Sequence, residues 1–212
     1  MRIDVMGVGF DSLTMDEAVA RARDLMAERR AAYVVTPNPE IVMLCRDDPA
    51  AMQAVQGADL VLPDGIGVIY GAKILGTPLR AKLPGIDFAS ALMAQMGQEG
   101  KSVFLLGAKP GVADAAAEKM RERFPGLVIA GTNDGYFQDD DPVVEKINAA
   151  QPDRCSCASA HRSRSYGCSA THRVCASASW PASAAVWTCS PAMSSARRSF
   201  SRSSGSSGFT GS

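Results

Sequence analysis

The chain has 212 residues, 46% of them hydrophobic, which is enough for one domain of ordinary size with a substantial core. Its formal charge of zero combines two unlike parts: residues 1–153 hold 15 basic and 22 acidic side chains, and residues 154–212 hold seven arginines and no acid. The acidic balance of the first part excludes nucleic acid as an expected partner. The N-terminus has no basic segment before an apolar run, and no window reaches the roughly 20 apolar residues of a membrane span, so we expect a cytoplasmic protein.

The first 150 residues alternate between strand-like and helix-like segments. In chain order we expect strands at 2–5, 33–35, 58–62, 102–106 and 127–130. We expect helices after the capping-box pattern Thr14-Met-Asp-Glu17 and at 41–46, 50–56, 66–75, 86–96, 112–123 and 143–149. Such alternation predicts an α/β fold: a Rossmann-like, mostly parallel sheet with flanking helices, which binds ligands at the carboxyl ends of its strands.

The alternation stops at Asp153. Of the 59 residues that follow, 18 are Ser, 10 are Ala and none is Leu or Ile. Such a composition cannot bury enough apolar area to offset the entropy of the chain. We therefore expect an α/β domain over residues 1–153 and a disordered, low-complexity tail over residues 154–212.

The tail also reads as a frame-shift product. With the reading frame moved back by one base, Cys155-Ser-Cys157 permits VLL, residues 160–167 permit GSPKQELW and residues 180–192 permit MAGVGGSLDVFAG. These restored segments continue the α/β pattern as a buried strand, a glycine loop and an amphipathic segment. The domain over 1–153 is then incomplete at its C-terminal end; the alternative is a natural Ser/Arg tail.

Two strand ends in the first half have polar side chains suited to a site. Thr36 and Asn38 follow the strand at 33–35, and the prolines between and after them stiffen the loop. Asn38 is equally suited to cap the helix that follows. Asp64 follows the strand at 58–62 and precedes Gly65, where it can serve as a general base or cap the next helix.

Two further strand ends have glycine-rich loops. The turn from Gly107 to Gly111 leads into a helix, an arrangement that presents backbone amides to phosphate, although a plain turn explains it as well. Asn133, Asp134 and Tyr136 follow the strand at 127–130 and can reach a sugar or a base. Residues 1–153 contain no histidine and no cysteine pair, so we expect no metal site.

Taken together, these segments resemble the WecG/TagA/CpsF family of bacterial glycosyltransferases. The resemblance covers nearly all of residues 3–150, in matching order and spacing, and the restored GSPKQELW and GVGGSLDVFAG also follow in that family. The matching segments are VVTPNPEIVMLCRDDP, ADLVLPDGIGVIYGAKILG, LPGIDF, SVFLLGAKPGVADAAAEKM and GTNDGYF.

The resemblance implies an inverting transferase that needs neither metal nor cofactor. Such an enzyme moves a sugar similar to N-acetylmannosamine from a UDP donor to an acceptor on undecaprenyl diphosphate, in exopolysaccharide, teichoic acid or surface-antigen synthesis. By position, Asp64 matches the general base and Thr36 and Asn38 match the substrate pocket. Lys82 stands where arginine is usual, so its contact with phosphate is that of a point charge.

The Gln and Glu of the family's PxQE motif are missing from this chain, as are the basic C-terminal residues. Peripheral contact with the inner face of the cytoplasmic membrane is therefore expected of an intact relative. The alternatives are an inactive chain that only binds nucleotide, a Ser/Arg-tailed binding protein, and a nicotinamide-dependent oxidoreductase, which the missing GxGxxG pattern disfavours. Homo-oligomer formation and the identity of the sugar are left open.

Overall fold

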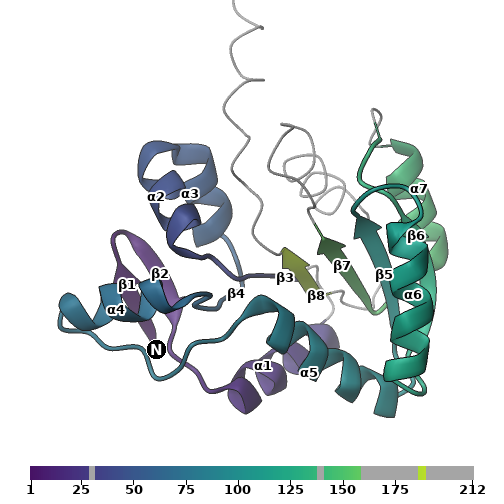
Figure 1. The fold of residues 1–212 in the computed structure, drawn as a ribbon, viewed down its shortest axis with the longest axis horizontal. Coiled ribbons are helices and arrows are strands. Elements are labelled where there is room, and N and C mark those ends of the chain that lie inside the picture. The colour runs from purple at the N-terminus through teal and green to yellow at the C-terminus, as the bar shows by residue number, and fades with distance from the viewer. Residues whose placement is uncertain (29–31, 138–140, 159–185, 190–212) are drawn as a thin grey trace, which may run out of the picture.

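A computed structural model describes residues 1–28, 32–137, 141–158 and 186–189 (Figure 1). It contains a two-stranded antiparallel hairpin and a six-stranded parallel sheet with the strand order β4-β3-β8-β7-β5-β6. The predicted α/β fold with a mostly parallel sheet is thereby confirmed. The strands are β1 (Arg2–Val5), β2 (Val8–Asp11), β3 (Ala32–Val35), β4 (Leu60–Val61), β5 (Ser102–Gly107), β6 (Val128–Asn133), β7 (Arg154–Ala158) and β8 (Val186–Cys189).

Seven helices connect the described strands and cover the sheet. They agree with the predicted helices to within a few residues at each end. Their bounds are α1 (Met15–Ala27), α2 (Pro39–Asp47), α3 (Pro49–Gln56), α4 (Ile66–Ile74), α5 (Gly85–Gln98), α6 (Val112–Arg123) and α7 (Asp141–Ala150).

The capping box predicted before α1 is present. The Thr14 hydroxyl accepts a hydrogen bond from the N–H of Glu17 at 3.3 Å, and the Glu17 carboxylate accepts one from the N–H of Thr14 at 2.8 Å. These reciprocal bonds satisfy two backbone donors that the first turn would otherwise leave free. The bond from the Thr14 N–H, together with Arg80, lowers the pKa of Glu17.

The hairpin is only half predicted, because β2 is missing from the expected strands. Met6 and Gly7 connect the two strands with φ values of 57° and 90°. Positive φ at both central residues is the geometry of a type I′ hairpin, whose usual signal is Asn-Gly or Asp-Gly. Met6 in that position gives no such signal.

Alternate side chains of each strand pack on opposite faces of the sheet. Val34 and Val103 belong to a core that α1, α5 and α6 cover. Val35, the next residue along β3, instead packs with the hairpin, α2, α3 and α4. Phe104, the next residue along β5, packs with α7 and β7. This period of two is what a sheet covered on both faces requires.

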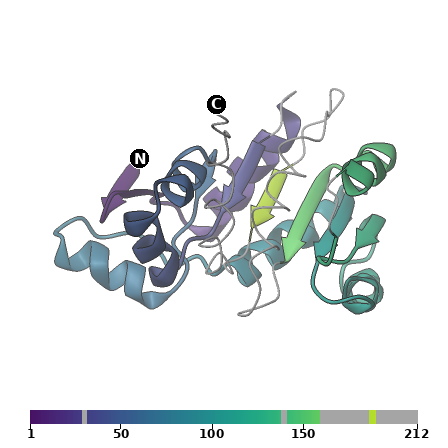
Figure 2. The same cartoon turned by 90° about the horizontal axis from the view of Figure 1, so that it is seen from above.

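The structure differs from the predicted domain boundary at residue 153. Strands β7 and β8, both from the stretch expected to be disordered, lie at the centre of the sheet, and Figure 2 shows β8 in yellow between β3 and the green β7. Arg154 and Cys155 are fully buried. The remainder of the predicted tail lies outside the described residues. The strand at 154–158 includes the positions where the restored reading frame expects one, but the frame shift itself stays a prediction.

Asp153 explains why a strand begins at this point. Its carboxylate accepts hydrogen bonds from the N–H and hydroxyl of Ser102, both at 2.8 Å, and from Lys101 Nζ at 3.1 Å. The hydroxyl of Ser102 in turn accepts from the N–H of Asp153 at 2.9 Å. Burial opposes the charge of this carboxylate, but the bonds from Ser102 and Lys101 outweigh it and lower the pKa of Asp153. The start of β7 is thus fixed to the start of β5.

Candidate active site

The described loops that follow β3, β4, β5 and β6 open at one edge of the sheet, the upper edge in Figure 1. Strands β8 and β7 lie between β3 and β5, so the predicted site residues fall into two groups rather than one. Three spacings between neighbouring strands separate β3 from β5, a distance of roughly 14 Å. One group follows β3 and β4, and the other follows β5 and β6.

Asp64 is the centre of the first group. Its N–H donates to the carbonyl of Pro37 at 3.1 Å, which joins the loops after β3 and β4. Its Oδ2 accepts a hydrogen bond from the N–H of Gly85, the first residue of α5, at 3.3 Å. No other described residue donates to this carboxylate. Asp64 therefore lies where two strand ends and a helix N-terminus meet.

The alternative that Asp64 caps the helix after it is wrong. The N-cap of α4 is Gly65, with φ of 91°, and no side chain bonds to that helix end. The carboxylate instead lies at the N-terminus of α5, where the helix dipole favours a negative charge. This contact joins residues 21 positions apart and has no local signal in the sequence.

Thr36 lies against the same helix end. Only 2% of it is exposed, and its hydroxyl has no hydrogen-bond partner in the described structure. A Cβ at Gly85 would stand 2.7 Å from this hydroxyl, so only glycine allows the approach. A buried hydroxyl without a partner is costly and requires an explanation, and a ligand that bonds to it is one.

Asn38 has the capping role that the sequence allowed. It is the N-cap of α2, and its Oδ1 accepts a hydrogen bond from the N–H of Ile41 at 3.0 Å. Its position in the loop after β3 places it beside Thr36 in the chain. The predicted contact of Asn38 with substrate stays a prediction.

Lys82 lies in the loop between α4 and α5, next to the first group. Its neighbour Leu83 donates a backbone hydrogen bond to the carbonyl of Pro63 at 2.8 Å, which holds this loop beside Asp64. Lys82 is exposed and has no ion pair among the described residues. Arg80, two residues earlier, is instead paired with Glu17 at 2.8 Å.

The second group begins at Gly107, the last residue of β5. The turn has positive φ values of 122° at Gly107, 62° at Ala108 and 81° at Gly111, the N-cap of α6. No side chain caps the N-terminus of α6. The N–H of Val112 donates to the carbonyl of Lys109 at 3.0 Å, which leaves the next amides of the first turn, those of Ala113 and Asp114, for an anion. The N–H of Gly135 donates to the carbonyl of Ala108 at 2.9 Å, which joins this turn to the loop after β6.

Asn133, Asp134 and Tyr136 are tied into the loop after β6. Asp134 Oδ1 accepts from the N–H of Tyr136 at 2.8 Å, and Asn133 Nδ2 donates to the carbonyl of Asp134 at 3.0 Å. Lys146 of α7, which the sequence did not single out, donates to Asn133 Oδ1 at 3.3 Å. It adds a positive charge that only the packing of α7 reveals. The Tyr136 ring is exposed.

A family model of known proteins, described as the glycosyl transferase WecG/TagA/CpsF family, matches residues 3–177. The chain belongs to this family. The matched range includes both groups of site residues and continues past the predicted boundary at residue 153. Because the family consists of glycosyl transferases, the nicotinamide-dependent oxidoreductase is set aside.

Two curated relatives have the same name, N-acetylglucosaminyldiphosphoundecaprenol N-acetyl-beta-D-mannosaminyltransferase. The protein of Bacillus spizizenii strain W23 is 38% identical over 126 residues, which are 59% of this chain and 49% of the relative. The protein of Staphylococcus aureus strain NCTC 8325 is 31% identical over 155 residues, which are 72% of this chain and 61% of the relative. The chain thus spans about half to three-fifths of the length of these relatives.

Neither a metal centre nor a membrane span is found in the part of the family fold that is described. Within residues 1–28, 32–137, 141–158 and 186–189, no three His, Cys, Asp or Glu side chains gather as metal ligands would. No helix among the same residues is long and apolar enough to cross a bilayer.

Proposed function

We propose that this chain has the fold and catalytic base of a transferase that moves N-acetylmannosamine from a UDP-sugar to N-acetylglucosamine on undecaprenyl diphosphate. The names of the two relatives support the transferred sugar and the acceptor. The UDP donor follows from the resemblance of the strand-end segments. The observation on which the proposal depends is the cluster of Asp64, Thr36 and Gly85 at the carboxyl ends of β3 and β4.

Asp64 is the general base in this proposal. Its carboxylate takes the proton of the acceptor hydroxyl, the hydroxyl oxygen forms a bond to the anomeric carbon, and the bond from that carbon to the UDP oxygen breaks. A single displacement of this kind inverts the anomeric configuration. The bond from Gly85 occupies Oδ2 at 3.3 Å, and none of the described residues donates to Oδ1, so that oxygen can take the proton.

Thr36 is a positioning residue in the same cluster. Its buried hydroxyl has no partner among the described residues and lies against Gly85. Substrate bound at the helix end would supply the missing hydrogen bond. The gain of one bond to a buried hydroxyl contributes about 1 kcal/mol to binding.

The charge of the departing UDP requires stabilisation by donors and cations. The N-terminus of α6, after the turn at Gly107, supplies backbone amides, and Lys82 supplies a positive charge from the loop that Leu83 joins to Pro63. Asn133 and Tyr136 lie beside the α6 turn and are assigned to the nucleotide. An extended nucleotide sugar connects the two groups, with its diphosphate toward α6 and its sugar toward Asp64.

Calorimetric titration of the full chain with UDP-N-acetylmannosamine tests the donor and the predicted independence of metal. We expect binding of the same affinity with and without EDTA. Binding only after magnesium or manganese is added would contradict the metal-independent assignment.

The transfer itself is measured by mass spectrometry, with a short-chain prenyl-diphosphate N-acetylglucosamine as acceptor. The assay uses the gene with its reading frame restored, because the chain as it stands lacks the PxQE segment. We expect a disaccharide product of inverted configuration. A frame-restored protein that binds the donor and forms no product would contradict the proposed reaction.

The second candidate is a chain that binds nucleotide without transferring sugar. One observation at the centre of the sheet favours this candidate. Strand β7 contains the fully buried Arg154, and residues 155–212, which follow it, contain no acid. The loops after the central strands then lack the carboxylate that PxQE supplies. This candidate predicts that the unaltered chain binds the donor and forms no product, whereas the frame-restored chain forms product.

A further inference from the structure

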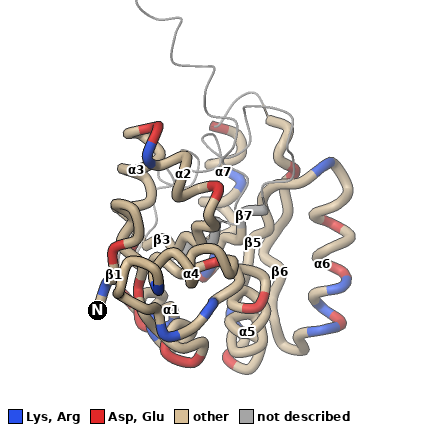
Figure 3. The backbone as a smooth tube through the Cα atoms, turned by 60° about the vertical axis from the view of Figure 1, so that its left-hand side comes forward, with Lys and Arg blue, Asp and Glu red and all other residues tan. Residues whose placement is uncertain are grey.

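The carboxyl end of β6 is held from both faces of the sheet. On the face that α6 covers, Thr132 donates its hydroxyl to the carboxylate of Asp114. On the face that α7 covers, Lys146 Nζ donates to the carbonyl of Thr132 at 2.7 Å and to Asn133 Oδ1 at 3.3 Å. Figure 3 marks the charged residues along α7, where Lys146 is the only cation. Two helices thus hold the residues at this strand end in place.

These contacts determine which way the amide of Asn133 points. An ammonium group only donates hydrogen bonds, and a carbonyl only accepts them. Asn133 Oδ1 therefore faces Lys146, and Asn133 Nδ2 faces the carbonyl of Asp134, to which it donates at 3.0 Å. Rotation of the amide by half a turn would place its nitrogen against a cation and its oxygen against another oxygen. The side chain is held in one of its two orientations.

The fixed amide keeps one donor and one acceptor for a ligand. An amide oxygen accepts two hydrogen bonds and an amide nitrogen donates two, and the described residues take one of each at Asn133. A neighbouring donor and acceptor match the O4 and the N3–H of uracil. Cytosine presents the reverse pattern, a donor at N4 and an acceptor at N3, and would need the rotated amide.

Tyr136 offers a surface for the base itself. Its ring is 58% exposed, and its N–H donates to Asp134 Oδ1 at 2.8 Å, so it belongs to the same bonded loop as Asn133. Bases of every kind stack on exposed aromatic rings. A ring in this place therefore contributes affinity, and the choice between two pyrimidines falls to the amide.

We propose that Lys146 is a positioning residue that selects uracil over cytosine by holding the amide of Asn133 in one orientation. The proposal rests on the proposed function, because that function supplies a uridine nucleotide as the ligand. It extends the nucleotide site to α7, a helix that carries none of the residues predicted from the sequence.

Calorimetric titration of the full chain with UDP and with CDP tests the proposal. The measured quantity is the ratio of the two dissociation constants. We expect the wild type to prefer UDP by about tenfold or more, as is usual when an amide pairs with a base through two hydrogen bonds. Lys146→Met removes the ammonium group and keeps an apolar stem. It should lower the preference to about threefold or less, because the amide can then rotate to pair with cytosine.

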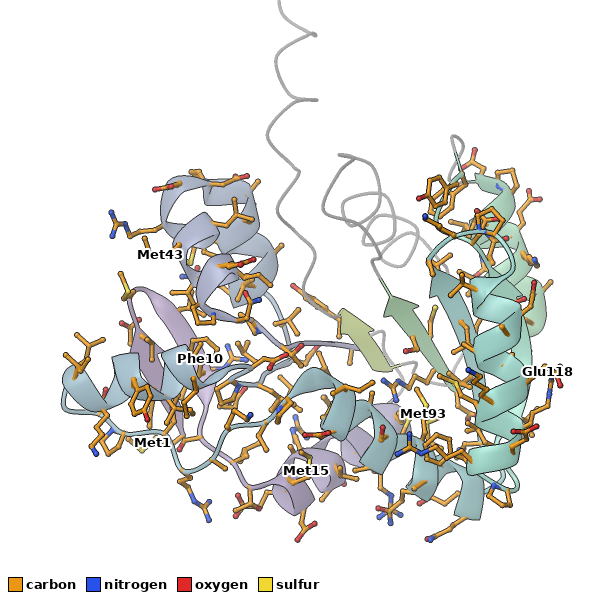
Figure 4. The ribbon with its side chains drawn as sticks, in the orientation of Figure 1. Met1, Phe10, Met15, Met43, Met93 and Glu118 are labelled. Atoms are coloured by element: carbon orange, nitrogen blue, oxygen red, sulfur yellow. The ribbon has the colours of Figure 1, made fainter. Side chains whose placement is uncertain are left out.

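Two further variants isolate the effect. Lys119→Met makes the same change of charge at an exposed position of α6, next to Glu118, whose side chain projects from that helix in Figure 4. It should leave both dissociation constants unchanged. Asn133→Leu removes the amide and should abolish the preference for UDP. In that background Lys146→Met should have no further effect on the ratio.

Two results would overturn the proposal. An equal loss of UDP and CDP affinity in Lys146→Met would mean that the ammonium group binds the diphosphate. A change of the ratio by Lys146→Met in the Asn133→Leu background would mean that the lysine does not act through this amide. Circular dichroism confirms that the variants remain folded, as expected for the exposed positions 119 and 146.

Base selection and the proposed function fail in different ways. Equal affinity of the wild type for UDP and CDP contradicts base selection and leaves the UDP donor intact. A chain that prefers UDP, with a frame-restored form that transfers no sugar, supports base selection and contradicts only the proposed reaction. A chain that binds neither nucleotide contradicts the proposed donor and base selection together.

Discussion

The edge of the sheet at β3 and β4 and its centre at β7 and β8 are built from opposite kinds of sequence. The edge consists of buried aliphatic residues followed by polar loops, in which Thr36 and Asp64 both lie against Gly85. The centre consists of RCSCA and VWTC, from a stretch without Leu, Ile or any acid. Yet both are parallel strands of one sheet, and Cys155 is as buried as Val34.

These two regions show that the place of a segment in this sheet depends on the strands beside it as much as on its own amino-acid composition. Asp153 fixes the start of β7 to Ser102 of β5, and the strand then pairs along its length with β5 and β8. A central parallel strand is covered on both faces and needs no alternating pattern. Cysteine is among the residues most often buried, so its presence does not prevent a core position.

A charge placed in β7 should have the largest effect on stability. Cys155→Asp should lower the free energy of unfolding by about 3 kcal/mol or more, because an unpaired charge would be buried in the sheet. Urea unfolding measures the loss. The control is Gln151→Asp at an exposed position, with an expected change within about 0.5 kcal/mol. Equal stability of the two variants would mean that residue 155 is solvated, as its composition first suggested.

Removal of the Asp153 carboxylate, which holds the start of β7 to β5, should have a smaller effect on the free energy of unfolding. Asp153→Ala leaves the N–H of Ser102 without its partner and should cost about 1–3 kcal/mol. The pKa of Asp153 is lowered in the folded state, so its contribution is present above the unfolded pKa and is lost as pH falls through the folded value. The stability difference between wild type and variant should therefore shrink below about pH 4. A difference that grows on acidification would contradict the assigned contacts.

The cap at Asn38 should have the smallest effect on stability. Asn38→Ala removes the bond to the N–H of Ile41 and should cost about 1 kcal/mol in thermal unfolding. Asn38→Asp keeps an acceptor at the same place and should remain close to wild type. If both variants are equally destabilised, the capping bond is not the reason for asparagine at this position.

The sequence predicts most of the fold and half of the site geometry. Helices and strands with regular apolar patterns were placed correctly, and the strand-tip position of Asp64 followed from the alternation of elements. The insertion of β7 and β8 between β3 and β5, which divides the site residues into two groups, has no local signal. The same holds for the contact between Thr36 and Gly85, since it depends on how α5 returns to the sheet.

The central claim is that Asp64 acts as the base, and one measurement tests it most directly. In the frame-restored protein, Asp64→Asn keeps an oxygen that can accept the hydrogen bond from Gly85, so the loops and donor binding should stay intact. Single-turnover transfer of N-acetylmannosamine should fall by about 10²–10⁴, the usual contribution of a positioned acid or base. Calorimetric titration with the UDP-sugar serves as the control for binding. A variant that binds the donor and turns over at nearly the wild-type rate would contradict the account.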